Sequence, residues 1–229
     1  MRLNNTKMIL AVDGGAASGK STGAKLIARK YKLYFLSSGL LYRYASYLII
    51  KHNPKNKILF LSKKFKKLNY GNIKNLNLHN QKISEHTAII AKEKKIRLIL
   101  RIFQKKFAKK YKNVCIEGRD IASEILKSRP RYDIAFYFSC DLNTAAYRRW
   151  KELKMFNKKI SLKEVKKTLK NRNEQDKRRR YSPLKRVRDA VLIRSDILNK
   201  KEMVAKMSNE IEKKLFLKTY GRNFKNRKK

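Results

Sequence analysis

The stretch that decides the fold lies near the N-terminus and reads Gly14-Gly15-Ala16-Ala17-Ser18-Gly19-Lys20-Ser21. It satisfies the pattern Gly-x-x-x-x-Gly-Lys-Ser, in which small residues let backbone amides curl around a phosphate and the lysine reaches the transferring phosphate. The context also fits, because residues 7–12 read as a buried strand and residues 19–31 carry apolar side chains at helical spacing. The sequence therefore predicts a triphosphate-binding loop that ends one strand and opens one helix.

This loop predicts a donor site but does not identify an acceptor, because many classes of protein bind nucleoside triphosphates in the same way. Residues 14–22 are the predicted ATP-binding segment, and Lys20 is the predicted catalytic cation. The hydroxyl of Ser21 is the predicted protein ligand of Mg²⁺, the ion that we expect to accompany ATP.

Strand-like and helix-like segments alternate along the rest of the chain. Short apolar runs typical of buried strands lie at residues 33–36, 114–116, 133–140 and 190–193. Helical patterns lie at residues 39–51, 143–155 and 161–180, and a last helix is expected from Asn199 to about residue 217. Alternation of this kind predicts an α/β domain with a parallel sheet covered on both faces. We expect a single domain over residues 1–229, with a frayed basic tail at 218–229.

The middle of the chain is harder to interpret. A lysine-rich helical pattern covers residues 58–68, and short alternations rich in Asn and Gly follow at 70–83. These patterns predict a small inserted helix and a hairpin. Residues 84–112 repeat apolar side chains at three and four, so one or two amphipathic helices are expected there.

The composition is strongly basic: 61 Lys and Arg stand against 17 Asp and Glu, a formal net charge of +44. Such a field attracts polyanions, but the lysines are scattered and no nucleic-acid recognition motif accompanies them. We expect solvated basic faces and no nucleic-acid partner. Apolar runs are too short to span a bilayer, and the two cysteines show no pairing pattern, so we expect a cytoplasmic monomer with reduced thiols.

Arginines recur beside turns and strand ends, where they could bind phosphate oxygens bidentately. Arg119 follows a predicted strand directly, which is where doubly wound sheets bind ligands. Farther on, Arg172, Asp176 and Arg179 are spaced so that they share one helical face. On spacing alone we interpret these three residues as surface decoration, because basic residues flank them throughout this helix.

Several short motifs, taken in their order along the chain, resemble the sequence pattern of the bacterial cytidylate kinase family. They are Asp13-Gly14, Ser18-Gly19-Lys20-Ser21-Thr22, Ser38-Gly39-Leu40-Leu41-Tyr42-Arg43, Ile96-Arg97, Gly118-Arg119-Asp120-Ile121, Arg148-Arg149, and Arg172, Asp176 and Arg179 followed by Ser182-Pro183-Leu184. The resemblance covers residues 8 to about 215. It implies a P-loop fold like that of adenylate kinase, with a five-stranded parallel core, a nucleotide-monophosphate-binding insertion within residues 39–110 and a lid within 150–172.

The resemblance also implies an activity and roles for single residues. The expected reaction is ATP-dependent phosphorylation of CMP or dCMP in pyrimidine nucleotide metabolism. By this likeness Arg43 and Arg119 hold the acceptor phosphate, and Arg119 with Arg148 or Arg149 stabilises the transferring charge. The full set implied to line the CMP site is Ser38, Arg43, Arg97, Arg119, Asp120, Arg172, Asp176 and Arg179. Within it, Arg172 and Asp176 would grip the ribose, and Arg97, Asp120 and Arg179 would read the base.

Departures from the family pattern leave one role open. The family usually has proline at Gly15, aspartate at Glu117, glycine at Ala122 and arginine at Gln175. None of these changes removes a charged site residue. The serine that contacts the base has two candidates here, Ser84 and Thr87.

Two other classes of function agree with part of this sequence pattern. Another small P-loop kinase, acting on UMP, a nucleoside or dephospho-coenzyme A, would have the same loop but should lack the arginine and aspartate landmarks. A nucleic-acid-associated protein would use the loop only to bind nucleotide and its basic surface to bind the polymer.

Overall fold

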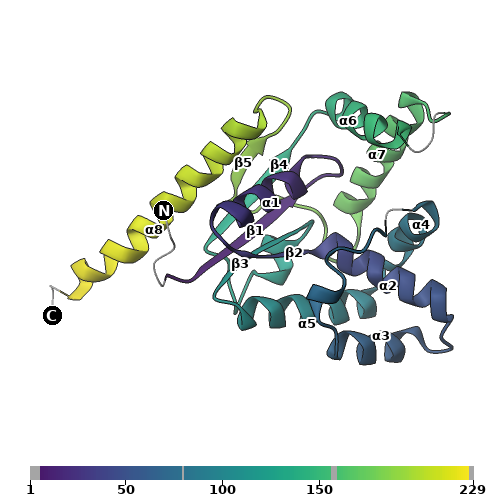
Figure 1. Ribbon diagram of the computed structural model, residues 1–229, viewed down its shortest axis with the longest axis horizontal. Coiled ribbons are helices and arrows are strands. Elements are labelled where there is room, and N and C mark those ends of the chain that lie inside the picture. The colour runs from purple at the N-terminus through teal and green to yellow at the C-terminus, as the bar shows by residue number, and fades with distance from the viewer. Residues whose placement is uncertain (1–5, 79, 156–158, 227–229) are drawn as a thin grey trace. The chain divides into compact units, whose positions relative to one another are not determined.

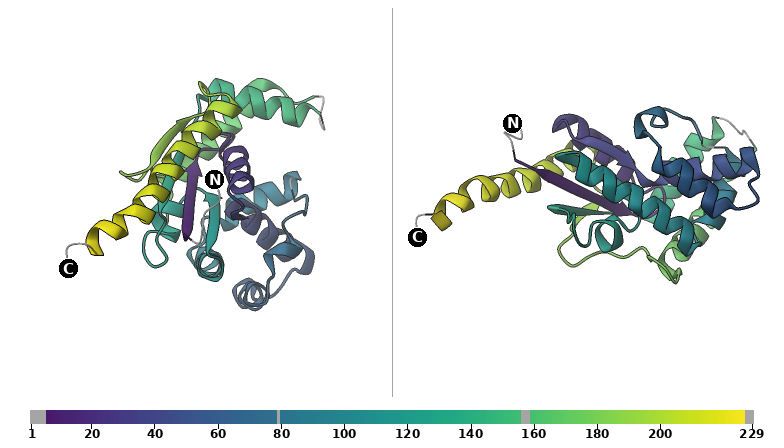
Figure 2. Two further views of the ribbon diagram at one scale, coloured as in Figure 1. Left: turned by 60° about the vertical axis from the view of Figure 1, so that its left-hand side comes forward. Right: turned by 90° about the horizontal axis from the view of Figure 1, so that it is seen from below.

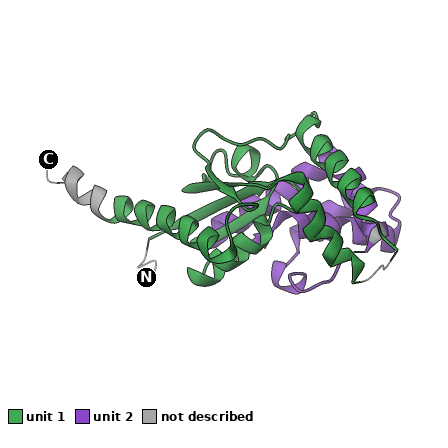
Figure 3. Ribbon diagram, turned by 90° about the horizontal axis from the view of Figure 1, so that it is seen from above, with its two compact units in different colours: residues 1–35, 112–229 green, residues 36–111 purple. Residues whose placement is uncertain are grey.

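The computed structural model describes residues 6–78, 80–155 and 159–226. The chain divides into two compact units, which Figure 3 shows in different colours. Unit 1 comprises residues 1–35 and 112–229, and unit 2 comprises residues 36–111. The first boundary falls within the second strand of the sheet and the second just before the third strand, so in sequence unit 2 is an insertion between these two strands.

Five strands form one sheet in the order β2-β3-β1-β4-β5, as the α/β prediction required. Their bounds are Met8–Gly14 (β1), Tyr34–Ser37 (β2), Asn113–Gly118 (β3), Ile134–Ser139 (β4) and Val191–Arg194 (β5). β1 lies parallel to β3 and β4, with Asp13 opposite Gly118 and Tyr137. This register brings the carboxyl ends of β1 and β3 to the same edge, so the loops after Gly14 and Gly118 begin side by side.

The α-helices of unit 1 are α1 (Lys20–Lys30), α6 (Leu142–Lys154), α7 (Leu162–Arg178) and α8 (Lys200–Asn226). The main core joins α1 and α8 to one face of the sheet through fully buried side chains such as Ile27, Phe136, Phe138 and Met207. Figure 2 shows α8 as a long helix that continues towards the C-terminus beyond the strands. It extends past residue 217, where we expected it to end, and residues 227–229 of the predicted tail lie outside the described residues.

A second apolar cluster joins α6 and α7 to the glycine-rich loop. Ala145 and Ala146 of α6 and Val165 and Leu169 of α7 pack there with the methyl group of Ala16. α7 begins at a capping box, in which Ser161 and Glu164 each satisfy a backbone N–H of the other. The loop therefore packs against α6 and α7, the two helices whose residues overlap the predicted lid segment. Residues 156–158 of that segment lie outside the described residues.

Unit 2 is helical, with α2 (Ser38–His52), α3 (Lys57–Lys66), η1 (Tyr70–Asn72), α4 (Gln81–Ile90) and α5 (Lys94–Lys110). The hairpin expected at residues 70–83 is wrong: the described residues of that segment form η1, a turn and the start of α4. The reason is local, because Asn69 and Asn80 accept hydrogen bonds from the N–H groups of Gly71 and Ile83 and so cap helices.

A short π-helix, η2 (Ile121–Ile125), follows β3 and was not anticipated. Its first residues turn back towards the end of β1, where they meet Asp13. Among the described residues, no helix is both long enough and apolar enough to cross a membrane.

Candidate active site

The glycine-rich loop sits where the sequence placed it, between β1 and α1 (Figure 1). Gly19 precedes α1 with φ of 75°, a left-handed conformation that glycine adopts without a steric cost. Lys20 folds back so that its Nζ donates to the carbonyl oxygen of Gly15 at 3.1 Å. The lysine is thus held over the mouth of the loop.

The charge state of Lys20 is sensitive to its surroundings. The pKa of Lys20 is lowered to about 7, first by burial and then by the nearby guanidinium groups of Arg119 and Arg172. A bound phosphate would supply the negative charge that this buried ammonium group needs. The lysine is accordingly poised to bind an anion.

Asp13 ties the end of β1 to the start of η2. Its two carboxylate oxygens accept hydrogen bonds from the N–H groups of Ile121 and Ala122, each at 2.8 Å. Burial raises the pKa of Asp13 to about 7, since the side chain is only 2% exposed. These bonds fix the position of Arg119 and Asp120, which immediately precede η2, beside the loop.

Four side chains of alternating charge form a row of ion pairs at this edge of the sheet: Arg119, Asp176, Arg179 and Asp120. The Nε of Arg119 lies 2.9 Å from a carboxylate oxygen of Asp176. Asp176 is also 3.2 Å from Arg179, whose other guanidinium nitrogen is 3.8 Å from Asp120. All four side chains are less than a fifth exposed, so the interpretation of Asp176 and Arg179 as surface decoration is wrong.

This row of ion pairs contacts the glycine-rich loop directly. Arg119 donates from Nη1 to the carbonyl oxygen of Gly14. On α7, Asn173 accepts a hydrogen bond from the N–H of Ala16 at 2.8 Å. In sequence Asn173 lies between Arg172, which is exposed, and Asp176, which is half-buried. Asn173 was not predicted, because one asparagine in a chain rich in asparagine carries no spacing signal of its own.

The two arginines of α6 do not contact the loop in the same way. Arg148 donates to the carbonyl oxygen of Ser195 at 2.8 Å, and the hydroxyl of Ser195 donates to the carbonyl oxygen of Ser18. Arg149 pairs with Glu152 on the surface of α6. Arg148 therefore reaches the loop through Ser195, whereas Arg149 faces a neighbour on its own helix.

The candidate residues of unit 2 lie close to one another within that unit. Ser37 caps α2 through Leu40, while Ser38 is buried in its first turn. Arg43 donates to the hydroxyl of Ser84 at 2.8 Å and to the carbonyl oxygen of Leu78. The guanidinium group of Arg97 lies over the ring of Tyr42 and donates to the carbonyl oxygen of Ala91.

The two candidates for the base-contacting serine therefore have different surroundings. Ser84 lies beside Arg43, whereas the hydroxyl of Thr87 is 2.9 Å from that of Ser46 in the interior of unit 2. Both are on α4, whose residues from 84 onward lie in the segment where the sequence predicted amphipathic helices.

Three features define a P-loop phosphotransferase: a triphosphate loop after a parallel strand, a partly buried lysine within that loop, and a row of paired arginines and aspartates against it. The loop accounts for the donor, and cations that contact the loop from other segments suit a second anion.

Comparison with known proteins gives the family. Residues 10–213 match the family model described as cytidylate kinase. Cytidylate kinase of Mesomycoplasma hyopneumoniae is 31% identical over 225 residues, covering 91% of this chain and 95% of that protein. Cytidylate kinase of Bartonella tribocorum is 34% identical over 190 residues, covering 81% and 85%. The chain belongs to the cytidylate kinase family, and its activity is the ATP-dependent phosphorylation of CMP.

Solved structures support the fold alone. A protein of Eubacterium ventriosum shares 16% identity with a TM-score of 0.56, over 90% of this chain and 99% of that one. The protein TT1252 of Thermus thermophilus shares 14% identity with a TM-score of 0.52, over 92% and 99%. The predicted P-loop fold is confirmed by the five-stranded parallel sheet with the glycine-rich loop between β1 and α1, together with the family match.

Proposed function

We propose that the chain transfers the γ-phosphoryl group of ATP in line to the phosphate of CMP or dCMP, with Lys20 and Arg119 stabilising the transferred charge. One observation carries this proposal: Arg119 joins the loop carbonyl of Gly14 to the carboxylate of Asp176. A cation in that place can contact both the transferring group and the acceptor. Contacts of this kind contribute roughly 10³ to 10⁵ in rate in phosphoryl transfer.

The acceptor nucleotide is assigned to the same cluster of unit 1. In the proposed complex Asp176 and Arg172 bind the ribose, and Asp120 and Arg179 contact the base. The ion pairs among these residues support the assignment, because a paired guanidinium group retains further N–H donors for a ligand. No general base is needed, since the acceptor phosphate is already an anion at neutral pH.

Residues of unit 2 complete the proposed set. Ser38, Arg43 and Arg97 are assigned to CMP through the family resemblance, with Arg43 on its phosphate and Arg97 on its base. Ser84 and Thr87 both stay candidates for the base-contacting hydroxyl, and Ser84 lies beside Arg43, the residue assigned to the phosphate. We propose residues 39–110 as the nucleotide-monophosphate-binding insertion and 150–172 as a lid that excludes water from the reaction.

Mg²⁺ fits the donor site through Ser21. This hydroxyl lies in the first turn of α1, directly after Lys20, and is partly exposed. Mg²⁺ that accompanies a nucleoside triphosphate is bound mainly by phosphate oxygens and water, so one hydroxyl is a sufficient protein ligand. When bound, Mg²⁺ would neutralise phosphate charge. Arg148, through Ser195, would keep Ser18 and the loop in place around the donor.

We also propose a cytoplasmic location, where ATP and CMP are available. Cys115 and Cys140 are both free thiols, which agrees with a reducing compartment.

A coupled assay of ADP release tests the proposal with CMP, dCMP, UMP, AMP and GMP as acceptors. We expect turnover with CMP and dCMP, little with the others, and loss of turnover in Lys20→Ala. Added polynucleotide should not replace the acceptor. Turnover of Lys20→Ala at the parent rate would remove the loop from the mechanism, and tight polynucleotide binding without a phosphorylated acceptor would favour a nucleic-acid-associated role.

A further inference from the structure

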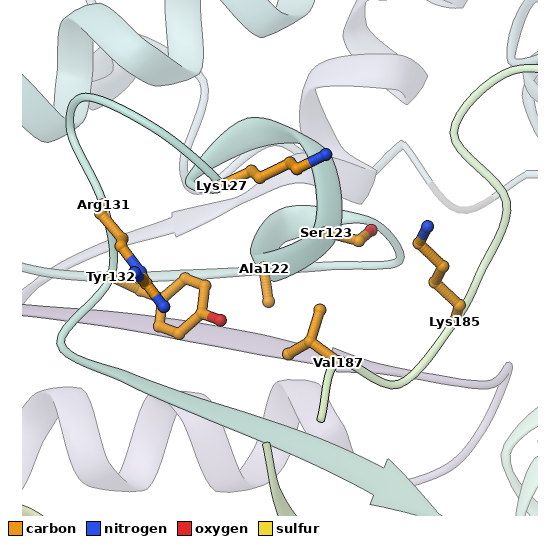
Figure 4. A pocket seen from close by; sticks show the side chains of 7 residues that line it. All are labelled: Ala122, Ser123, Lys127, Arg131, Tyr132, Lys185 and Val187. Carbon is orange, nitrogen blue, oxygen red and sulfur yellow. The ribbon is translucent and has the colours of Figure 1, made fainter. Parts of the chain in front are cut away.

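Unit 1 contains a basic pocket that the phosphotransferase reaction does not use (Figure 4). It lies between η2, the segment that leads from η2 to β4, and the loop that precedes β5, and its volume is about 320 Å³. That volume is at the lower end of the range for small-molecule sites, roughly 300–1,000 Å³. A small ligand would fill it.

Three cationic side chains line this pocket: Lys127, Arg131 and Lys185. Neither Lys127 nor Lys185 forms an ion pair within the described part of the chain. Arg131 lies 3.6 Å from Asp189, and both side chains are more than half exposed, so that pair is weak. The lining therefore favours a negatively charged ligand.

Ser123 supplies a polar group inside the pocket. The residue is only 3% exposed, and its Oγ has no hydrogen-bond partner among the described residues. Figure 4 shows its hydroxyl on the side of η2 where Lys185 lies. Buried hydroxyl groups nearly always have a partner, so an orphan that lines a cationic pocket indicates a ligand oxygen.

η2 separates this pocket from the P-loop. Its backbone N–H groups at Ile121 and Ala122 bind the carboxylate of Asp13, whereas the side chains of Ala122 and Ser123 line the pocket. The pocket is therefore a second site and not an extension of the loop.

We propose that this pocket binds the phosphate group of a small anion, with the Ser123 hydroxyl donating a hydrogen bond to a phosphate oxygen and Lys127, Arg131 and Lys185 neutralising its charge. Inorganic phosphate and a phosphomonoester share this chemistry. The site does not depend on the roles proposed for the CMP-binding residues.

Calorimetric titration of inorganic phosphate tests the proposal, with the enzyme first saturated by a non-hydrolysable ATP analogue and CMP so that the reaction site is occupied. We expect one phosphate per chain. Ser123→Ala should weaken it roughly tenfold, the effect of one hydrogen bond to a charged group. That substitution leaves the net charge unchanged, so a general attraction to the basic surface would not respond to it. It should also fold normally, because it removes an unsatisfied group.

The double variant Lys127→Gln/Lys185→Gln should lose most of the binding, whereas Lys201→Gln/Lys206→Gln, with the same charge change on exposed positions of α8, should not. Equal weakening by both pairs, together with unchanged binding in Ser123→Ala, would overturn the site and attribute binding to the overall field. Glycerol 3-phosphate provides the second arm: tighter binding than phosphate identifies a phosphomonoester as the ligand, and equal binding identifies free phosphate.

Discussion

Asn173 accepts a hydrogen bond from the backbone N–H of Ala16, the third residue of the P-loop, at 2.8 Å. The methyl group of Ala16 packs at the same place against α6 and α7. α7 also carries Arg172 and Asp176, so the helix that carries these proposed acceptor-binding residues is attached to the glycine-rich loop. We infer that Asn173 positions the acceptor residues relative to the transferring phosphate.

Replacement of Asn173 by alanine should lower kcat for CMP roughly 2- to 12-fold, because it removes one hydrogen bond worth about 0.5–1.5 kcal/mol. Asn173→Asp retains the acceptor oxygen and should recover part of the loss in kcat, whereas its negative charge beside the phosphate-binding loop should raise the KM for ATP. Steady-state kinetics with both substrates measures the effect. Asn171→Ala, at an exposed position of the same helix, is the matched control. If Asn173→Ala and Asn171→Ala behave alike, the contact has no positioning role.

Asp176→Ala should lower kcat/KM for CMP roughly 10- to 150-fold, which corresponds to about 1.5–3 kcal/mol of lost transition-state stabilisation. The KM for ATP should change less. The carboxylate pairs with both Arg119 and Arg179, so its loss removes an acceptor contact and also frees two guanidinium groups. Glu174→Ala removes a carboxylate from the same helix that pairs with Lys177 and Arg178 near the surface. Unchanged kcat/KM in Asp176→Ala would exclude the residue from acceptor binding.

The parts of the site predicted from sequence are those whose signal is local. The loop from Gly14 to Ser21 is a contiguous motif, and Arg119 follows a strand that its apolar residues reveal. Helical spacing placed Arg172, Asp176 and Arg179 on one face, yet it left open what that face meets. On that face Asp176 pairs with Arg119, which is distant from it in sequence. Arg119 lies beside the glycine-rich loop because β1 and β3 end at the same edge of the sheet.

Other features had no readable local signal. The contact of Asn173 with a backbone N–H follows from where α7 packs, and the route from Arg148 through Ser195 to Ser18 joins three segments. The incorrect hairpin at residues 70–83 arose because Asn and Gly favour strand turns and helix caps alike. Tertiary packing decides between the two, and here Asn80 begins a helix.

Gly23→Ala should destabilise the fold by about 1–3 kcal/mol through overpacking. A Cβ at Gly23 would lie 2.5 Å from Cζ of Phe138, whose fully buried ring cannot move aside. Urea unfolding followed by circular dichroism measures the change. Gly39→Ala is the comparison, because its Cβ would meet only the Ser37 hydroxyl at 3.7 Å and alanine favours α2. Equal stability of the parent and Gly23→Ala would show that α1 and β4 are less tightly packed than described.

ATP binding at pH 8 should take up close to one proton, and Lys20 is the group that takes it up. Its pKa of about 7 leaves the buried amine mostly uncharged at that pH, whereas the triphosphate favours the ammonium form. Uptake should fall towards zero at pH 6, where Lys20 is already charged, and ATP affinity should decrease as the pH rises above 7.

Calorimetry of ATP binding in buffers of different ionisation enthalpy measures this uptake directly. Lys20→Met should abolish it, and Lys25→Met, at an exposed position of α1, should leave it intact. A binding enthalpy at pH 8 that does not depend on the buffer would mean that the lysine is already charged in the free enzyme. In that case burial and the neighbouring guanidinium groups do not hold the pKa of Lys20 near 7, and the loop would bind ATP without taking up a proton.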